Sequence, residues 1–185
     1  MSSPQKQTSG IDIVASQWLN SDLPISIDNL RGQVVVIVAF QMLCPGCVSH
    51  CLPQASKIHQ LYGGQGVQVI GLHSVFEHHE AMSAVSLQAF LHEYQIQFPV
   101  AIDQASKTGP IPLTMANLHL QGTPTTIVID AEGVVRLKHF GQVPDLVLGE
   151  MLGQLRQPIS PPKAAISAQE QTATAGQCDD GVCSL

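Results

Sequence analysis

Residues 34–62 read VVVIVAFQMLCPGCVSHCLPQASKIHQLY, and the hydrophobic period changes within this stretch. Its first seven residues are apolar and mostly β-branched, which is typical of a strand buried on both faces. After Pro45 the apolar residues recur at helical spacing as far as Tyr62, and three glycines follow within four residues. The stretch therefore predicts a buried strand that leads into a helix, with Cys44 and Cys47 at the junction.

The same reasoning assigns elements along most of the chain. Extended structure is expected upstream, over residues 11–19. Downstream we expect strands at 67–72, 98–102, 125–130 and 134–140, and helices at 83–94 and 145–155. In the helix 83–94 the apolar face is predicted from Val85, Ala89, Phe90 and Tyr94. Parallel strands joined by helices, then a hairpin and a last helix, indicate a mixed α/β fold with helices on both faces of a central sheet.

Composition limits the classes of function. The chain has 185 residues, of which 44% are hydrophobic and 12% charged, so it can fold without structural disulfides or metals. Its formal charge of −6 opposes nucleic acid and anionic membrane surfaces as partners. We predict a disordered N-terminus at 1–10, one domain at 11–157, and a flexible Pro-, Ala- and Gln-rich tail at 158–185.

Two features bear on location. The polar first ten residues lack the basic start and apolar stretch of an export signal. Residues 32–56 contain no Asp, Glu, Lys or Arg, but their continuous apolar part is far shorter than the roughly 20 residues of a membrane span. The sequence therefore predicts a cytoplasmic protein without a membrane partner.

The segment Cys44-Pro45-Gly46-Cys47 is the strongest chemical signal. Unpaired N–H groups and the dipole at a helix N-terminus stabilise a thiolate, so Cys44 is expected to act as a nucleophile. Cys47, three residues on and on the same helix face, is placed to resolve the resulting mixed disulfide. Half of a zinc site is the alternative, but zinc needs a second ligand pair, and Cys178 and Cys183 lack the spacing.

A second motif, Gly122-Thr-Pro-Thr-Thr-Ile-Val-Ile-Asp130 followed by Glu132-Gly133, enters a predicted strand and hairpin. Together with the cysteine motif it resembles the thioredoxin-like superfamily. The closest likeness is to TlpA-like and redoxin-type thiol-disulfide oxidoreductases, which are related to the AhpC/TSA proteins. The resemblance implies a cis peptide bond before Pro124, beside the cysteines, and substrate contact through the Thr123 backbone.

The chain departs from that family at several positions. Leu43 stands where tryptophan is usual, the cysteine pair sits one residue early, and residues 34–40 contain no buried carboxylate. The segment Pro45-Gly46-Cys47-Val48 also resembles peroxiredoxins of the bacterioferritin-comigratory type. A peroxiredoxin-like thiol peroxidase with an antioxidant role, using Cys47 as the peroxidatic cysteine, is therefore the alternative hypothesis.

Other candidate residues are weaker. Cys51 is predicted to be a small buried side chain beneath the reactive pair. His50 is rotated away from Cys44 on the helix. His73 follows a strand at the same end of the sheet, and residues 77–80 read EHHE. For these histidines and their acidic neighbours a solvated loop or an exposed helix start is expected.

The tail ends in Cys178-Asp-Asp-Gly-Val-Cys183. Two interpretations stay open: an accessory dithiol that exchanges electrons with Cys44 and Cys47, or a solvent-exposed tail whose cysteines bind metal or have no role. The expected function is disulfide exchange with protein or small-molecule thiols and disulfides, supplied by an unidentified electron donor, with no metal or organic cofactor. A metal-binding or interaction protein is the non-enzymatic alternative.

Overall fold

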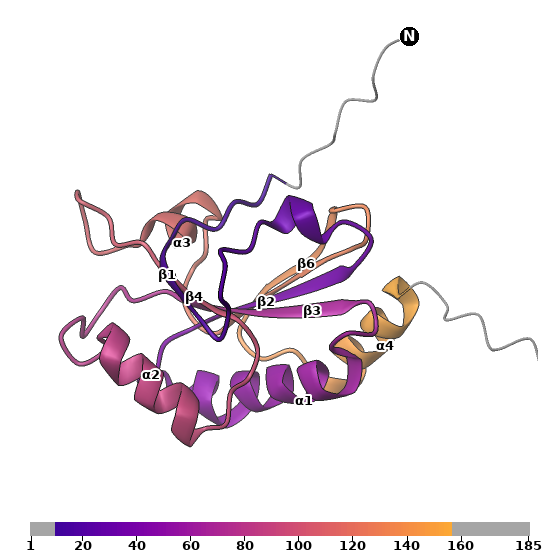
Figure 1. Ribbon diagram of the computed structural model, residues 1–185, viewed down its shortest axis with the longest axis horizontal. Coiled ribbons are helices and arrows are strands. Elements are labelled where there is room, and N and C mark those ends of the chain that lie inside the picture. Colours follow the sequence, from indigo (N-terminus) through magenta and orange to yellow (C-terminus); the bar gives the residue numbers. More distant parts are fainter. Residues whose placement is uncertain (1–9, 157–185) are drawn as a thin grey trace, which may run out of the picture.

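A computed structural model describes residues 10–156, which form a six-stranded sheet covered by helices (Figure 1). The elements follow one another as β1 (Ala15–Leu19), the 3-10 helix η1 (Ile27–Leu30), β2 (Val34–Phe40), the π-helical turn η2 (Cys47–Cys51), α1 (Leu52–Tyr62), β3 (Val67–His73), α2 (Ala84–Glu93), β4 (Val100–Asp103), α3 (Leu113–Asn117), β5 (Thr125–Ile129), β6 (Val135–Phe140) and α4 (Asp145–Leu155). The mixed α/β fold expected from the sequence is confirmed.

The strands lie in the order β1-β4-β3-β2-β5-β6. The strands β2, β3 and β4 are parallel, and β1, β5 and β6 are antiparallel to their neighbours. Because β2 pairs with β3 on one side and β5 on the other, it lies inside the sheet. Its carboxyl end, at Phe40, leads straight to the cysteine motif.

The continuous apolar run of β2 serves two separate cores. Val34, Val36, Val38 and Phe40 pack with α1, α2 and α4, whereas Val35, Ile37 and Ala39 pack on the opposite face. Figure 1 shows the three longer helices on one side of the sheet, with α3, η1 and the N-terminal segment on the other. Alternation along a strand sends successive side chains to opposite faces, so this strand must be apolar throughout.

The predicted face of α2 is wrong. Leu87 and Leu91 are its buried residues, whereas Val85 is 78% exposed and Tyr94 is 55% exposed. Ala89 is also exposed, and only Phe90 of the predicted face is partly buried. The helix contacts the core through Leu87 and Leu91, with Phe90 packed against the edge of the core, so the other three residues of the predicted face lie outside the contact.

The short helix α3 is absent from the sequence prediction because its five residues contain no apolar repeat. The carboxylate of Asp103, at the end of β4, holds its first turn. It accepts hydrogen bonds from the Thr114 N–H at 2.8 Å and the Met115 N–H at 2.9 Å, and from the Ser74 hydroxyl at 2.9 Å. A buried acid at the end of the preceding strand therefore caps this helix across the intervening loop.

Within residues 10–156, none of the helices is both long and apolar enough to cross a membrane. The predictions for the first nine residues and for residues 157–185 concern parts of the chain outside the described residues. The domain boundaries at 10 and 157 therefore stay predictions.

Candidate active site

The helix that carries the motif begins at Cys44, whose carbonyl oxygen accepts the Val48 N–H at 3.1 Å. One turn later the helical hydrogen bond spans five residues instead of four, because the Leu52 N–H donates to the Cys47 carbonyl oxygen. Pro53, the next residue, has no N–H with which to continue the ordinary helical ladder. This wider π-helical turn covers Cys47–Cys51, so the unusual geometry lies directly behind the motif.

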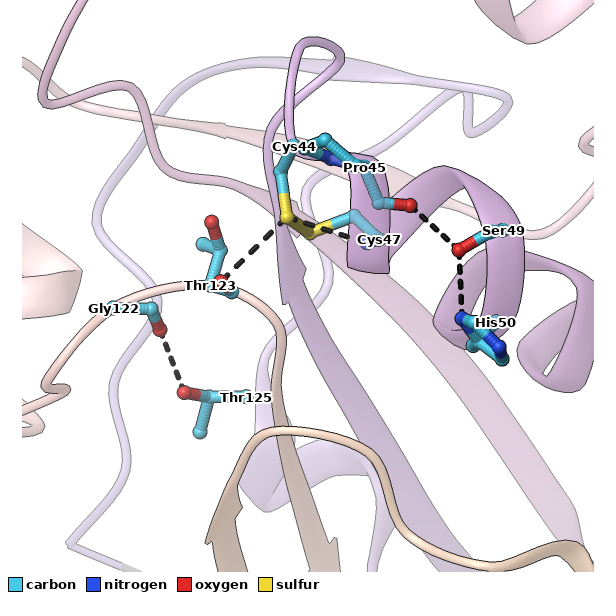
Figure 2. Close-up of a disulfide and its surroundings, with 8 residues drawn as sticks. All are labelled: Cys44, Pro45, Cys47, Ser49, His50, Gly122, Thr123 and Thr125. Carbon is cyan, nitrogen blue, oxygen red and sulfur yellow. Dashed lines mark hydrogen bonds between the residues drawn. A yellow bond between two sulfur atoms is a disulfide. The ribbon is translucent and has the colours of Figure 1, made fainter.

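Cys44 and Cys47 form a disulfide with their Cα atoms 5.2 Å apart (Figure 2). The two cysteines differ in access to solvent. Cys47 is completely buried, whereas Cys44 is partly exposed at the edge of the core. A molecule arriving from solvent therefore meets the sulfur of Cys44 first.

Two polar backbone groups lie close to the Cys44 sulfur. The Cys47 N–H donates to Cys44 Sγ at 3.2 Å, and the Thr123 carbonyl oxygen lies 3.5 Å from the same sulfur (Figure 2). After reduction, the N–H stabilises a Cys44 thiolate, as does the positive end of the helix dipole. The carbonyl can accept a hydrogen bond from the protonated thiol. Cys44 thus has the environment of a reactive cysteine.

The loop before β5 forms the other side of the site. The Thr123–Pro124 peptide bond is cis, as the resemblance implied. A methyl group built on Gly46 would lie 3.5 Å from Pro124 Cδ, so the Pro124 ring packs against the motif. Thr125 Oγ1 donates to the Gly122 oxygen at 2.7 Å, and the Gly141 N–H donates to the Pro124 oxygen at 2.8 Å. These bonds hold the loop beside the disulfide.

Two exposed apolar side chains near the site were not assigned a role from the sequence. Leu43, which precedes Cys44, is 57% exposed, and Phe140, at the end of β6, is 51% exposed. Phe140 packs against the loop, since a methyl group on Gly122 would lie 2.9 Å from its ring. Strand β6 pairs Phe140 with Thr125, which places the Phe140 ring beside the loop.

Cys51 is buried, as predicted, and is a free thiol. Burial raises its pKa to about 12, although a hydrogen bond with Thr126 acts in the opposite direction. The thiol therefore stays protonated at neutral pH, and the prediction of a small buried side chain is confirmed.

His73 corrects the sequence prediction of a solvated residue. It is the last residue of β3, is 1% exposed, and has its ring centroid 5.2 Å from that of its register partner Phe40. Burial lowers its pKa to about 4. Gln41, just after β2, is equally buried. Two buried polar side chains, those of Gln41 and His73, therefore lie where β2 and β3 end. Within the described residues His73 forms no hydrogen bond with either cysteine.

The remaining candidates lie apart from the disulfide. The Ser49 hydroxyl donates to the Pro45 oxygen at 2.7 Å and lies 2.6 Å from His50 Nδ1, which holds the His50 ring away from the cysteines (Figure 2). Residues 77–80 are exposed, as expected. No cluster of three metal-ligating side chains occurs among residues 10–156. Cys178 and Cys183 lie outside the described residues.

Comparison with known proteins agrees with this geometry. The Redoxin family model matches residues 19–151, which include the whole site. The chain belongs to the Redoxin family. A solved thiol-disulfide isomerase from Corynebacterium glutamicum is 47% identical, with a TM-score of 0.76 over 82% of this chain and 97% of that one. A thioredoxin-like superfamily protein is 48% identical, with a TM-score of 0.75 over 80% of this chain and 96% of that one.

Curated relatives are similar over the same core. NHL repeat-containing protein 2 of Gallus gallus is 36% identical over 129 residues, which are 68% of this chain and 16% of that protein. Thiol-disulfide oxidoreductase ResA of Bacillus cereus is 25% identical over 118 residues, 64% of this chain and 61% of ResA. The chain thus spans less than two thirds of these relatives. The thioredoxin-like resemblance expected from the two motifs is confirmed.

Proposed function

We propose that this Redoxin-family chain is a thiol-disulfide oxidoreductase in which Cys44 attacks the substrate and Cys47 resolves the intermediate. The observation that carries the proposal is the unequal access of the two sulfurs in one disulfide, with a backbone N–H directed at the more accessible one. The thiol-disulfide oxidoreductases and the isomerase among its relatives support the same class of reaction.

The reaction has two balanced steps. In the reduced protein the Cys44 thiolate attacks a substrate disulfide, forms a bond to one substrate sulfur and releases the other as a thiolate that takes up a proton. Cys47 then loses its proton and attacks Cys44 Sγ, which releases the second substrate thiol and forms the disulfide. Two electrons pass from the protein to the substrate, and a dithiol donor restores the starting state.

The surroundings of Cys44 favour a substrate with an extended backbone. The Thr123 carbonyl lies beside the reactive sulfur, and Leu43 and Phe140 add exposed apolar surface near it. We infer that Thr123 and Pro124 position a protein or small-molecule disulfide for attack. Exchange then requires that one sulfur of the substrate disulfide lies within reach of Cys44 Sγ.

Peroxidase chemistry with Cys47 as the peroxidatic residue has less support. A peroxidatic thiolate must meet peroxide directly, and Cys47 is completely buried in this structure. Disulfide exchange begins at the partly exposed Cys44 instead. Oxidation of Cys47 by peroxide, faster than that of an ordinary cysteine, would revive this hypothesis.

Trapping experiments test the proposal. Cys47→Ser is expected to accumulate a mixed disulfide between Cys44 and a substrate such as oxidised glutathione, whereas Cys44→Ser is expected to accumulate none. Mass spectrometry after acid quench identifies the linked cysteine. Exchange retained by Cys44→Ser and lost in Cys47→Ser would reverse the roles, and exchange retained by both would overturn the proposal.

A further inference from the structure

Two exposed apolar side chains flank the reactive sulfur from different parts of the chain. Leu43 directly precedes Cys44 and is 57% exposed, and Phe140, from the end of β6, is 51% exposed. Isolated exposed apolar residues are ordinary, but these two lie on the two sides of a reactive group, as contact surfaces for other molecules do. Whatever covers them must also bring a sulfur atom to Cys44.

The distance from the sulfur to Phe140 follows from the loop before β5. The Thr123 carbonyl oxygen lies 3.5 Å from Cys44 Sγ (Figure 2). Gly122 is the next residue along the loop, and a methyl group built on it would lie 2.9 Å from the Phe140 ring. The ring is therefore two to three residues of extended chain away from the sulfur, at about 3.3 Å per residue.

The backbone of Thr123 is open to an incoming chain. Among residues 10–156, neither its N–H nor its carbonyl takes part in a backbone–backbone hydrogen bond. An extended polypeptide that pairs with these two groups runs along the loop past Gly122. Successive side chains of such a polypeptide point to opposite sides, so the side chain two residues from its cysteine lies on the same side as the cysteine. That side chain reaches the Phe140 ring.

Formal charge is absent from the segments that build the site. Residues 32–56, 118–129 and 139–144 contain no Asp, Glu, Lys or Arg, although the whole chain has a formal charge of −6. On β6, Lys138 donates to the Leu118 oxygen at 3.3 Å, so its ammonium group is engaged at the end of α3. A charged occupant would lose hydration here without gaining an ion pair from these segments. The site therefore favours a neutral, apolar occupant.

We propose that the substrate is an uncharged, extended polypeptide segment with an apolar side chain two residues from its reactive cysteine, and that Phe140 selects this side chain. The proposal deepens the proposed function and rests on it, because it names the substrate class for the same cysteine pair. The reaction is unchanged: the segment's sulfur bonds to Cys44, its former partner sulfur leaves as a thiolate that takes up a proton, and two electrons pass from the Cys44–Cys47 dithiol to the substrate. Phe140 acts by positioning that sulfur.

Two synthetic peptide disulfides test the preference. The peptides acetyl-Leu-Ala-Cys-Ala-Leu-amide and acetyl-Ser-Ala-Cys-Ala-Ser-amide, each oxidised to its symmetric disulfide, have the same residues next to cysteine and differ two residues away on both sides. The reduced protein is expected to exchange with the leucine peptide about tenfold faster, because a leucine side chain leaves water on contact with Phe140. Acid quench and chromatography give both rates. Equal rates for the two peptides would overturn the inference.

Variants at Phe140 test the residue that selects. Phe140→Ser is expected to reduce the leucine-to-serine rate ratio to below about twofold, whereas Phe140→Leu, which keeps an apolar side chain, is expected to retain a ratio above about fivefold. The ratio compares two peptides on one protein, so a loop shift that slows both peptides equally leaves it unchanged. A ratio that stays near tenfold in Phe140→Ser, or that falls equally in both variants, would overturn the role of Phe140.

Val135→Ser is the matched control. Val135 is 40% exposed on the same strand, but it pairs with Ile129, at the end of β5 away from the loop. The rate ratio of the two peptides is expected to stay near tenfold in this variant. A loss of preference as large as that in Phe140→Ser would assign the effect to β6 as a whole and overturn the position proposed for the apolar side chain.

A charged peptide tests the neutral character of the site. With glutamate in place of both leucines, exchange is expected to be no faster than with the serine peptide, even in about 0.5 M NaCl, where repulsion by the net charge is screened. Faster exchange with the glutamate peptide would overturn the choice of a neutral substrate.

Capture in the Cys47→Ser variant separates this inference from the proposed function. The leucine and serine peptides are both expected to be trapped on Cys44, the leucine peptide faster. Trapping of both peptides at equal rates would overturn only the substrate inference. If Cys44 traps neither peptide, nor oxidised glutathione, the proposed function itself is overturned.

Discussion

Two successive turns of one helix place cysteines in opposite chemical environments. In the first turn Cys44 is partly exposed and receives the Cys47 N–H at its sulfur. In the next turn Cys51 is buried, and burial raises its pKa to about 12. A cysteine at the helix start, Cys44, is thus activated, whereas Cys51, four residues after Cys47, stays a protonated and unreactive thiol. Position along the helix, more than residue type, decides the chemistry.

The largest expected effect comes from replacing each of these two cysteines in turn with a residue that has no thiol and comparing the two losses of activity. Cys44→Ser is expected to lower the rate of disulfide exchange at least about 1000-fold, because a serine hydroxyl does not form the attacking thiolate at neutral pH. Cys51→Ala is expected to stay within about twofold. Turnover of a small aromatic disulfide measures both. A large loss in Cys51→Ala, with the fold intact by circular dichroism, would break the contrast.

Burial acts on a base in the opposite sense, and His73 shows it. Its pKa of about 4 lies below the ordinary value of 6.5, so the unfolded chain takes up the proton first as pH falls. The resulting loss of unfolding free energy is negligible above pH 6.5 and reaches roughly 3 kcal/mol near pH 4. Urea unfolding of His73→Leu is expected to show a correspondingly flatter pH dependence.

Two controls isolate this effect. His92→Leu, which replaces an exposed histidine, is the control for the histidine-to-leucine substitution itself. Asp130 also loses stabilising contacts in acid: burial favours a raised pKa, but bonds from the Val134 N–H and from Arg136 hold that pKa below its ordinary value. Because both variants keep Asp130, its contribution cancels. Parallel curves for His73→Leu and the unaltered protein would contradict the account.

Adjacent threonines on β5 sharpen the comparison with a smaller effect. Thr125 anchors the loop through Gly122, and Thr126 hydrogen-bonds Cys51. Both are buried, so valine at either position is expected to cost about 1 kcal/mol of unfolding free energy. Thr125→Val is also expected to lower kcat/KM about fivefold, because the loop loses its anchor, whereas Thr126→Val is expected to leave it within twofold. Equal losses of kcat/KM in Thr125→Val and Thr126→Val would contradict the different roles assigned to the two threonines.

The sequence predicted the features that depend on local pattern. The seven apolar residues of β2 required burial on both faces, and the structure divides them between two cores. The helix start at Cys44 and the cis bond before Pro124 followed from motifs. These elements were predictable because each is determined by neighbours in the chain or by a recurring segment.

The errors arose where distant residues decide the structure. The α2 face follows from which side meets the sheet, so Leu87 and Leu91 are buried and Val85 is exposed. Helix α3 depends on Asp103, which lies ten residues before Leu113 at the end of the preceding strand β4. His73 is buried because the register of β3 places it beside Phe40. None of these pairings leaves a local signal.

Alkylation of the reduced, full-length protein tests the contrast between the two turns most directly. Iodoacetamide at pH 7, followed by timed acid quench and peptide mapping, gives a separate rate for each cysteine. Cys44 is expected to react at least about 100-fold faster than Cys51, because a thiol with a pKa of about 12 is almost wholly protonated at neutral pH. Rates for Cys44 and Cys51 within threefold of each other would contradict the account.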